Sequence, residues 1–408
     1  MSKCIICGSE HNNIPLQMPD GTIKEVCLNC MQSMASLFEQ LNAVADEVFK
    51  KDSDEDNFME FEVKKPAEIK KILDDYVIGQ DEAKKYIAVG IYNHYKRITS
   101  GKTDIQKSNI LMVGPTGVGK TEIARACAKI VNVPFCICDA TTVTEAGYVG
   151  DDVENMLLRL LQAADMDIEA AERGIIYIDE IDKIARKSEG MSITRDVSGE
   201  GVQQALLKII EGAEVDVPIT GGRKHPQGDR VRINTSNILF ICGGAFEGLT
   251  MDKNKKKALG FGATDTSAET DDNGETSDGL TPKLLEKQGL IPELVGRLPI
   301  TVRLHKLTKD ELKKILTDTK NSIMKQYTDL IGLDGVKLNI KEDALDLIAD
   351  KAYTNETGAR GLKSIIEKTM VDAMYEIPSE ENISSVDLTT KDGKLVVKKH
   401  YKRSKQTA

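Results

Sequence analysis

Short apolar runs alternate with stretches of helical periodicity from about residue 63 onward. Five of these runs predict short buried strands, at 109–113, 134–138, 175–178, 238–242 and 300–304. Strands that are almost wholly apolar and are separated by helices are typical of a parallel sheet with helices on both faces. The pattern therefore predicts an α/β domain over residues 63–305.

A second pattern follows this domain. Helical periodicity predicts three helices and then a strand-like end, at 308–328, 342–352, 359–376 and 394–399. We expect residues 306–408 to form a smaller, mainly helical domain. No internal repeat is visible.

The N-terminal segment has its own pattern. Apolar residues recur at helical spacing at Met34, Phe38, Leu41, Val44 and Val48. They predict either a helix that packs on its own small unit, over residues 1–45, or a dimerising face. Residues 46–62 are acidic with few apolar side chains, which predicts a flexible linker.

Composition excludes several classes of protein. The 408 residues are 40% hydrophobic and 29% charged, which excludes collagen, a coiled coil and a wholly disordered chain. No apolar run approaches the ~18 residues that cross a bilayer, and the first residues lack the apolar core of a signal peptide. We therefore expect a cytoplasmic protein with no membrane partner.

Charge argues against a nucleic-acid partner. Lys and Arg number 55 and Asp and Glu 65, so the net charge is −10. An acidic chain binds nucleic acid poorly unless one face is basic, and the basic cluster at 253–257 is short. Residues 263–279, which follow soon after this cluster, are almost wholly polar and predict a surface loop.

Four of the eight cysteines lie within the first thirty residues, as Cys4-x2-Cys7 and Cys27-x2-Cys30. Two CxxC turns can surround one zinc ion tetrahedrally, with no position left for water. A unit of about 45 residues has too little core to fold alone, so we predict a structural zinc domain that resembles a treble cysteine knuckle. Two disulfides are the alternative. The other cysteines lie in apolar stretches and predict reduced core residues, at Cys127, Cys136, Cys138 and Cys242.

A phosphate-binding loop follows the predicted strand at 109–113. Gly114-Pro-Thr-Gly-Val-Gly119-Lys120-Thr121 has the complete P-loop spacing and opens a helix. Its glycines let backbone amides approach phosphate oxygens. Lys120 is expected to neutralise the β- and γ-phosphates and the Thr121 hydroxyl to ligate Mg²⁺.

Two carboxylates end another apolar run, in Gly174-Ile-Ile-Tyr-Ile-Asp179-Glu180. Asp179 is placed to bind magnesium through water, and Glu180 to deprotonate the attacking water. Capping of a following helix is the alternative, which suits Asp182 better than this pair. The two motifs together predict ATP hydrolysis.

The combination of motifs resembles the ClpX family, bacterial AAA+ protein unfoldases of the Clp/Hsp100 group. The resemblance covers nearly the whole chain and includes the two nucleotide motifs, the sequence 75–80, Gly358-Ala-Arg360 and the four cysteines. It implies an AAA+ fold and a set of nucleotide-binding positions at Gly114, Pro115, Thr116, Gly117, Val118, Gly119, Lys120, Thr121, Glu122 and Asp179.

The resemblance also implies roles for other residues. Tyr76, Val77 and Ile78 would surround adenine, although ordinary core residues are the alternative. Arg360 would reach the phosphates from the small domain, and Arg297 would act as an arginine finger on the neighbouring subunit of a hexameric ring. A surface salt bridge is the alternative for either arginine.

Three loops complete the resemblance. Tyr148 and Val149, between two glycines, match a pore loop that grips substrate, with a core tyrosine as the alternative. Residues 191–201 match a second pore loop, and Arg223, Lys224 and His225 match a basic loop at the pore entrance. Leu259, Gly260 and Phe261 match the tip that docks into the peptidase ClpP, with leucine in place of the family's isoleucine.

The sequence thus predicts a hexameric, zinc-containing ATPase that unfolds proteins and delivers them to a ClpP-type peptidase. It binds protein substrates and adaptors and has no peptidase activity of its own, since no protease nucleophile is recognisable. A nucleic-acid motor of the AAA+ class and a zinc adaptor that only binds nucleotide are the alternatives. The Gly-Tyr-Val-Gly loop and the net charge argue against the first, and Glu180 against the second.

Overall fold

The structure is a computed structural model, and it divides into two compact units, Met1–Glu62 and Val63–Ala408. It describes residues 4, 7, 13–17, 23–30, 63–102, 104–143, 153–185, 199–219, 230–250, 280–380 and 382–402. In the first unit, β1 (Asn13–Gln17) and β2 (Ile23–Cys27) form an antiparallel hairpin.

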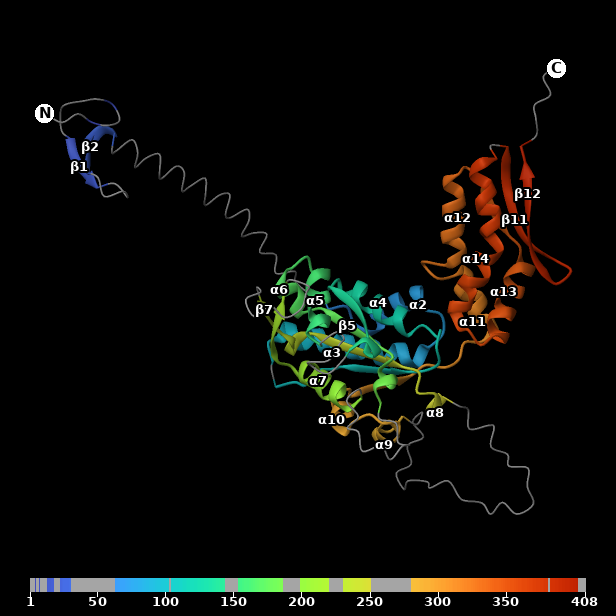
Figure 1. Cartoon of the computed structure of the whole chain (residues 1–408), viewed down its shortest axis with the longest axis horizontal. Coiled ribbons are helices and arrows are strands. Elements are labelled where there is room, and N and C mark those ends of the chain that lie inside the picture. The colour runs from blue at the N-terminus through green and yellow to red at the C-terminus, as the bar shows by residue number, and fades with distance from the viewer. Residues whose placement is uncertain are drawn as a thin grey trace, which may run out of the picture. The chain divides into compact units, whose positions relative to one another are not determined.

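The second unit begins with an α/β layer structure (Figure 1). Its central sheet is wholly parallel, and the order of its strands is β4 (Phe135–Asp139), β5 (Ile175–Asp179), β8 (Leu239–Gly244), β3 (Ile110–Val113) and β9 (Ile300–Arg303). These are the five strands predicted from the apolar runs. β3 and β8 are buried at every position, which explains why they are continuous apolar runs.

Helices cover both faces of this sheet, as predicted. On one face lie α2 (Pro66–Tyr76), α3 (Asp81–Ser100) and α4 (Lys120–Val131). α3 comes so close that a Cβ on Gly90 would lie 2.6 Å from Ile300 Cδ1. On the other face, α5 (Glu154–Ala163) and α7 (Glu200–Glu211) enclose the main core of the protein.

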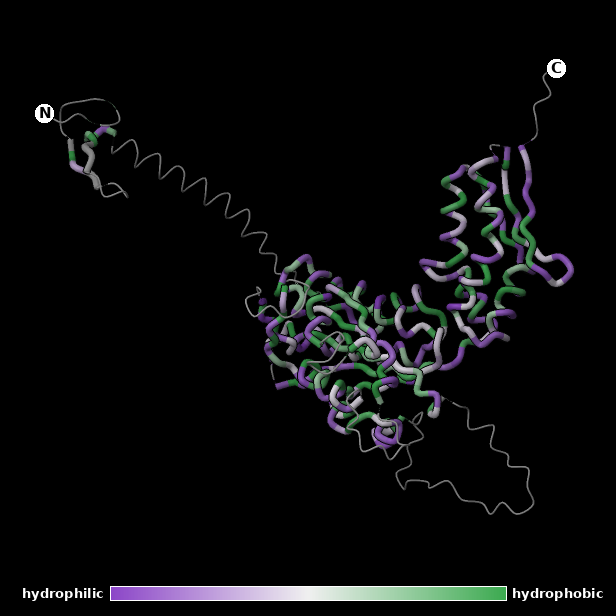
Figure 2. The backbone as a smooth tube through the Cα atoms, viewed as in Figure 1, coloured by the Kyte–Doolittle hydropathy of each residue, from purple (hydrophilic) through white to green (hydrophobic). Residues whose placement is uncertain are grey.

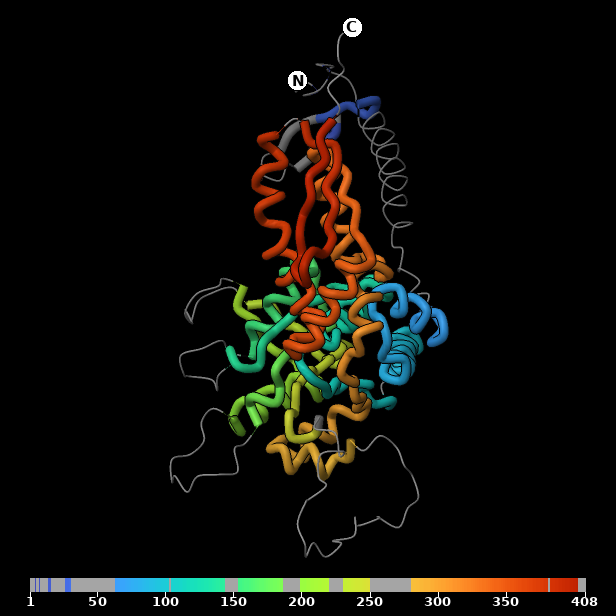
Figure 3. Tube along the Cα trace, turned by 90° about the vertical axis from the view of Figure 1, so that its right-hand side faces the viewer, coloured from blue at the N-terminus to red at the C-terminus, as the bar shows by residue number. Residues whose placement is uncertain are grey.

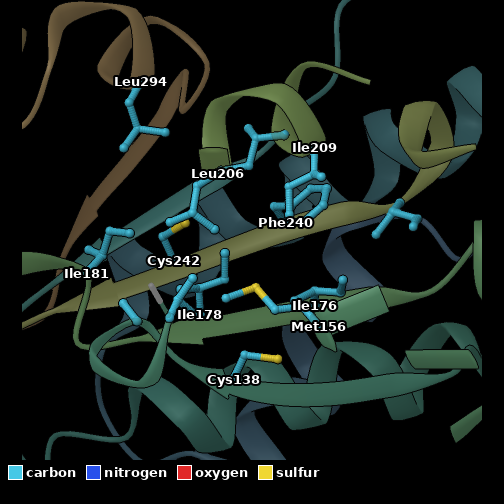
Figure 4. Packing of buried hydrophobic residues seen from close by; sticks show 14 of the residues in the cluster. Cys138, Met156, Ile176, Ile178, Ile181, Leu206, Ile209, Phe240, Cys242 and Leu294 are labelled. Atoms are coloured by element: carbon cyan, nitrogen blue, oxygen red, sulfur yellow. The ribbon is translucent and has the colours of Figure 1, made fainter. Parts of the chain in front are cut away.

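In that core, alternate side chains of the strands pack against side chains of α5 and α7 (Figure 4). Ile176, Ile178 and Phe240 point from the sheet toward Leu206 and Ile209 of α7. Shorter elements complete this part of the chain: α6 (Ile168–Glu172), α8 (Glu247–Thr250), α9 (Pro282–Lys287), α10 (Pro292–Gly296) and a hairpin of β6 (Glu214–Pro218) and β7 (Arg230–Asn234). The sequence did not predict this hairpin.

The C-terminal part has a separate core and is mainly helical (Figure 3). Its elements are α11 (Lys309–Thr317), α12 (Ile323–Leu333), β10 (Lys337–Ile340), α13 (Glu342–Thr354), α14 (Gly358–Glu376), β11 (Ile383–Lys391) and β12 (Lys394–Tyr401). The strand predicted at 394–399 lies in β12 and pairs with β11, which in turn pairs with β10.

The helix expected over 308–328 is two helices. The Ser322 side chain accepts a hydrogen bond from the amide of Lys325 and so begins α12. Hydropathy does not mark this break, because apolar residues alternate with polar ones along both helices (Figure 2). Within the described residues, no helix is long and apolar enough to cross a bilayer.

Burial of His94 makes the stability of this fold depend on pH. His94 on α3 is fully buried, its Nε2 lies 3.0 Å from the Asn237 carbonyl, and its Nδ1 has no partner among the described residues. Burial, with the nearby charges of Arg97 and Lys107, lowers its pKa from 6.5 to about 3. The unfolded chain therefore binds one more proton than the folded chain between these two pH values, so stability falls as the pH drops through this window.

We predict that lowering the pH from about 7.5 to 5.5 reduces the free energy of unfolding of both proteins, and that the reduction is about 1 kcal/mol larger for the wild type than for His94→Gln. The glutamine amide can still donate to the Asn237 carbonyl, but it does not titrate. Urea unfolding at the two pH values measures the difference. Equal pH dependence in the two proteins would contradict the prediction.

Candidate nucleotide and metal sites

The P-loop connects β3 to α4 in the position that its sequence predicts. Gly114 donates its amide to the Gly244 carbonyl at 3.1 Å, which fastens the loop to the end of β8. Gly117 and Gly119 have φ values of +79° and +105°, which favour glycine. Gly119 is the N-cap of α4, so the positive end of this helix faces the loop.

Lys120 is turned into the loop. Its ammonium donates to the carbonyls of Gly114 at 2.6 Å and Pro115 at 2.9 Å. Burial lowers the pKa of Lys120, while the carboxylates of Asp179, Asp182 and Glu180 oppose that change. A charged group that is mostly buried and satisfied only by carbonyls is well placed to exchange them for phosphate oxygens.

The two predicted carboxylates lie at the end of β5, next to the P-loop. The Thr121 hydroxyl is 3.4 Å from Asp179 Oδ2. Glu180 is exposed and has a φ of +56°, an uncommon conformation for a residue with a side chain. Asp182 does not cap a helix here, because its Oδ1 accepts the amide of Ala245 at 3.1 Å.

A cavity of about 290 Å³ adjoins the P-loop. Tyr76, Val77 and Ile78 line it, together with Val118, Gly119 and Glu122, all of which were predicted from the sequence. Val77 is buried, whereas Tyr76 and Ile78 are half-buried. Lysines lie on the Tyr76 ring, with Lys129 Nζ 5.6 Å and Lys320 Nζ 5.4 Å from its centroid.

The C-terminal part supplies the residues of this cavity that sequence reasoning missed. They are Leu307, Ile315, Thr319, Asn321, Ile323, Gln326 and Ala359. Arg125 and Lys129 of α4 were missed as well. The sequence pattern did not mark these residues as part of a site, because the apolar residues among them have the spacing of ordinary core residues.

The two predicted arginines lie in different places. Arg360, in the first turn of α14, is exposed and close enough to Lys120 to influence its pKa. Arg297, after α10, is half-exposed and pairs with Glu211 at the end of α7, with 2.8 Å between Nε and Oε1. Asn109 donates to the Arg297 carbonyl at 3.0 Å.

The four N-terminal cysteines converge. The sulfur atoms of Cys4, Cys7, Cys27 and Cys30 all lie within 4.8 Å of one another. A tetrahedral zinc–thiolate site has sulfurs about 3.8 Å apart, given a Zn–S distance of about 2.3 Å. None of the eight cysteines forms a disulfide, and Cys127, Cys136, Cys138 and Cys242 are buried as predicted. The cluster is therefore compatible with an N-terminal zinc domain.

Several predicted positions lie outside the described residues: Met34, Phe38, Leu41, Val44, Val48, Tyr148, Val149, Arg223, Lys224, His225, Leu259, Gly260 and Phe261. The segments 46–62, 253–257 and 263–279 also lie outside them, as does 191–198 of the second pore loop.

The fold and the site define a P-loop ATPase of the AAA class. The family described as AAA domain (Cdc48 subfamily) matches residues 105–301, and the C-terminal, D2-small domain of ClpB protein matches residues 307–390. The "ATP-dependent Clp protease ATP-binding subunit ClpX" of Treponema denticola is 56% identical over 321 residues, which are 77% of this chain and 77% of that protein. The chain therefore belongs to the ClpX family of AAA+ proteins.

The cysteine cluster gives a first prediction for this site. We expect the purified protein to contain one zinc ion per chain, and chelation to unfold the N-terminal unit but leave basal ATPase activity largely unchanged. The reason is that the nucleotide site is built wholly from the second unit, Val63–Ala408.

Metal analysis of two variants provides the control. Cys30→Ser is expected to lose the zinc, because it removes one of four ligands. Cys136→Ala removes a buried cysteine of β4 and is expected to keep it. Equal zinc content in both variants, or loss of ATPase activity on chelation while the large unit stays folded, would contradict the assignment.

Proposed function

We propose that the chain is an ATP-dependent protein unfoldase that passes substrates into a ClpP-type peptidase and has no peptidase activity of its own. The observation that carries this proposal is the meeting of the P-loop with Asp179 and Glu180 beside the cavity. Membership of the ClpX family supports the choice of protein, in place of nucleic acid, as the substrate. We propose a cytoplasmic location.

In this proposal the residues of the site divide the work of hydrolysis. Tyr76, Val77 and Ile78 bind the adenine in the cavity, and Lys120 exchanges its loop carbonyls for phosphate oxygens. Thr121 and Asp179 would bind Mg²⁺, which neutralises charge on the phosphates. Glu180 accepts the proton of the attacking water, for which its exposure at the end of β5 suits it.

Two arginines complete the proposed site. Arg360 contributes positive charge from α14, and it is close enough to Lys120 for its charge to lower the pKa of that lysine. Arg297 is proposed to leave its pair with Glu211 and to contact the nucleotide of the next subunit in a homohexameric ring. Such a pair between half-exposed side chains is weak, so it opposes this movement little.

Other proposed parts rest on the sequence. Tyr148 and Val149 grip the substrate, and the basic Arg223, Lys224 and His225 attract its carboxyl end. Leu259, Gly260 and Phe261 dock into the peptidase. The protein is proposed to bind protein substrates and adaptors, and its zinc unit, over residues 1–45, is proposed to dimerise. Residues 46–62 are the proposed linker between this unit and the large domain at 63–305, which the small domain at 306–408 follows.

We predict that Glu180→Gln binds ATP normally but hydrolyses it roughly 10²–10⁴-fold more slowly, because a positioned general base contributes about that factor. Phosphate release and equilibrium nucleotide binding measure the two effects. Glu169→Gln, at an exposed position on α6, is the matched control and should retain the wild-type rate. Near-normal hydrolysis by the Glu180 variant would remove this residue from its role.

The unfolding activity itself is tested with a stable, tagged substrate protein. Wild type should unfold it in an ATP-dependent reaction, and should degrade it only when ClpP is added. Tyr148→Ala should lose most of this unfolding while it keeps ATPase activity and its melting temperature, since the substitution removes the grip without touching the nucleotide site.

Tyr401→Ala, which removes a half-exposed tyrosine at the end of β12, should behave as wild type. If Tyr148 were instead a core residue, its truncation would cost roughly 3–5 kcal/mol of stability. A large drop in melting temperature would therefore exclude the pore-loop role, and so would full unfolding activity of the variant.

A further inference from the structure

Tyr177, in the middle of β5, places a hydroxyl group directly beside the predicted magnesium ligands. Its side chain is fully buried, and it lies on the same face of the strand as Asp179, two residues further on. The Tyr177 hydroxyl donates to Asp179 Oδ1 at 3.1 Å. A buried tyrosine hydroxyl needs a hydrogen-bond partner, and here that partner is a predicted magnesium ligand.

The neighbouring strand is shaped around that hydroxyl. Gly243 lies in β8, next to β5, and a Cβ at this position would be 2.2 Å from the Tyr177 oxygen and 2.9 Å from its Cζ. Gly243 has no positive φ, so its backbone does not require glycine. The absence of a side chain at 243 instead makes room for the tyrosine hydroxyl.

The two oxygens of Asp179 are thereby given different partners. Oδ1 accepts both the Tyr177 hydroxyl and, at 3.0 Å, the amide of Glu180. Oδ2 faces the Thr121 hydroxyl instead. With Oδ1 held by two donors, the carboxylate cannot rotate freely, and Oδ2 remains directed at the P-loop threonine.

We propose that Tyr177 is a positioning residue for the Mg²⁺ of the nucleotide site, orienting Asp179 from a slot opened by Gly243. The inference rests on the proposed nucleotide function. Residues that orient a metal ligand typically contribute 10–100-fold to metal affinity. The proposal therefore concerns how much Mg²⁺ strengthens nucleotide binding, a quantity that does not depend on turnover.

The test measures the affinity of the full chain for a fluorescent, non-hydrolysable ATP analogue, once with Mg²⁺ and once with EDTA. Tyr177→Phe removes one oxygen atom and leaves the ring in place. We expect it to lower the Mg²⁺-dependent gain in affinity roughly 10-fold and to leave the affinity in EDTA unchanged. Tyr95→Phe is the matched control, because Tyr95 is equally buried but donates to the Arg173 carbonyl, and it should keep the full gain.

A second variant approaches the same contact from the other side. Gly243→Ala keeps the tyrosine but places a methyl group where its hydroxyl lies, so it should lose the same Mg²⁺-dependent gain. An unchanged gain in Tyr177→Phe would overturn the inference, and so would an equal loss with and without Mg²⁺, which indicates a merely structural role. Failure of the wild type to bind the analogue would instead overturn the proposed nucleotide function.

Discussion

The amide of Ala359 donates a 2.9 Å hydrogen bond to the carbonyl of Gly117, and through it the P-loop touches the first turn of α14. Two glycines permit this approach of one backbone to another. A Cβ on Gly117 would lie 2.6 Å from the Thr357 carbonyl oxygen, and one on Gly358 would lie 2.7 Å from that of Gly117. Because the contact is between backbones, it couples the position of the P-loop to that of α14, which also carries Arg360.

A second contact fixes the turn after Tyr76 to the residues that lead into α11. The Gln80 side chain donates to the His305 carbonyl at 2.8 Å and accepts the His305 amide at 3.0 Å. Next to it, Gly79 leaves room for the Glu311 carboxylate, which belongs to the capping box that begins α11. The turn that follows Tyr76 is thus fixed to the start of the C-terminal part. The two contacts thus connect residues in and next to the cavity to the first turns of α11 and α14.

The sequence predicts those features that depend on local pattern. β3, β5 and β8 were found because burial on both faces makes them almost wholly apolar, whereas the outer strands β4 and β9 were found from short apolar runs. β10 and β11 were missed because they are only partly buried, and Ile383–Lys391 carries serines and threonines between its buried residues. The P-loop is contiguous and was recognised in full, whereas the contribution of Leu307 and Ile315 to the cavity arises only when distant segments meet. Likewise, nothing local separates Tyr177 from the isoleucines beside it in β5.

The topology of the sheet bears on where Arg297 can act. All five central strands are parallel, and the P-loop follows β3, so it lies at the carboxyl edge of the sheet. Arg297 precedes β9, whose first residue, Ile300, pairs with Ile110 at the opposite end of β3. The length of a four-residue strand, about 13 Å, therefore separates this arginine from its own P-loop along the strand direction. The sheet therefore disfavours contact between Arg297 and the nucleotide of its own chain, which supports the role proposed for this arginine at the nucleotide of another copy.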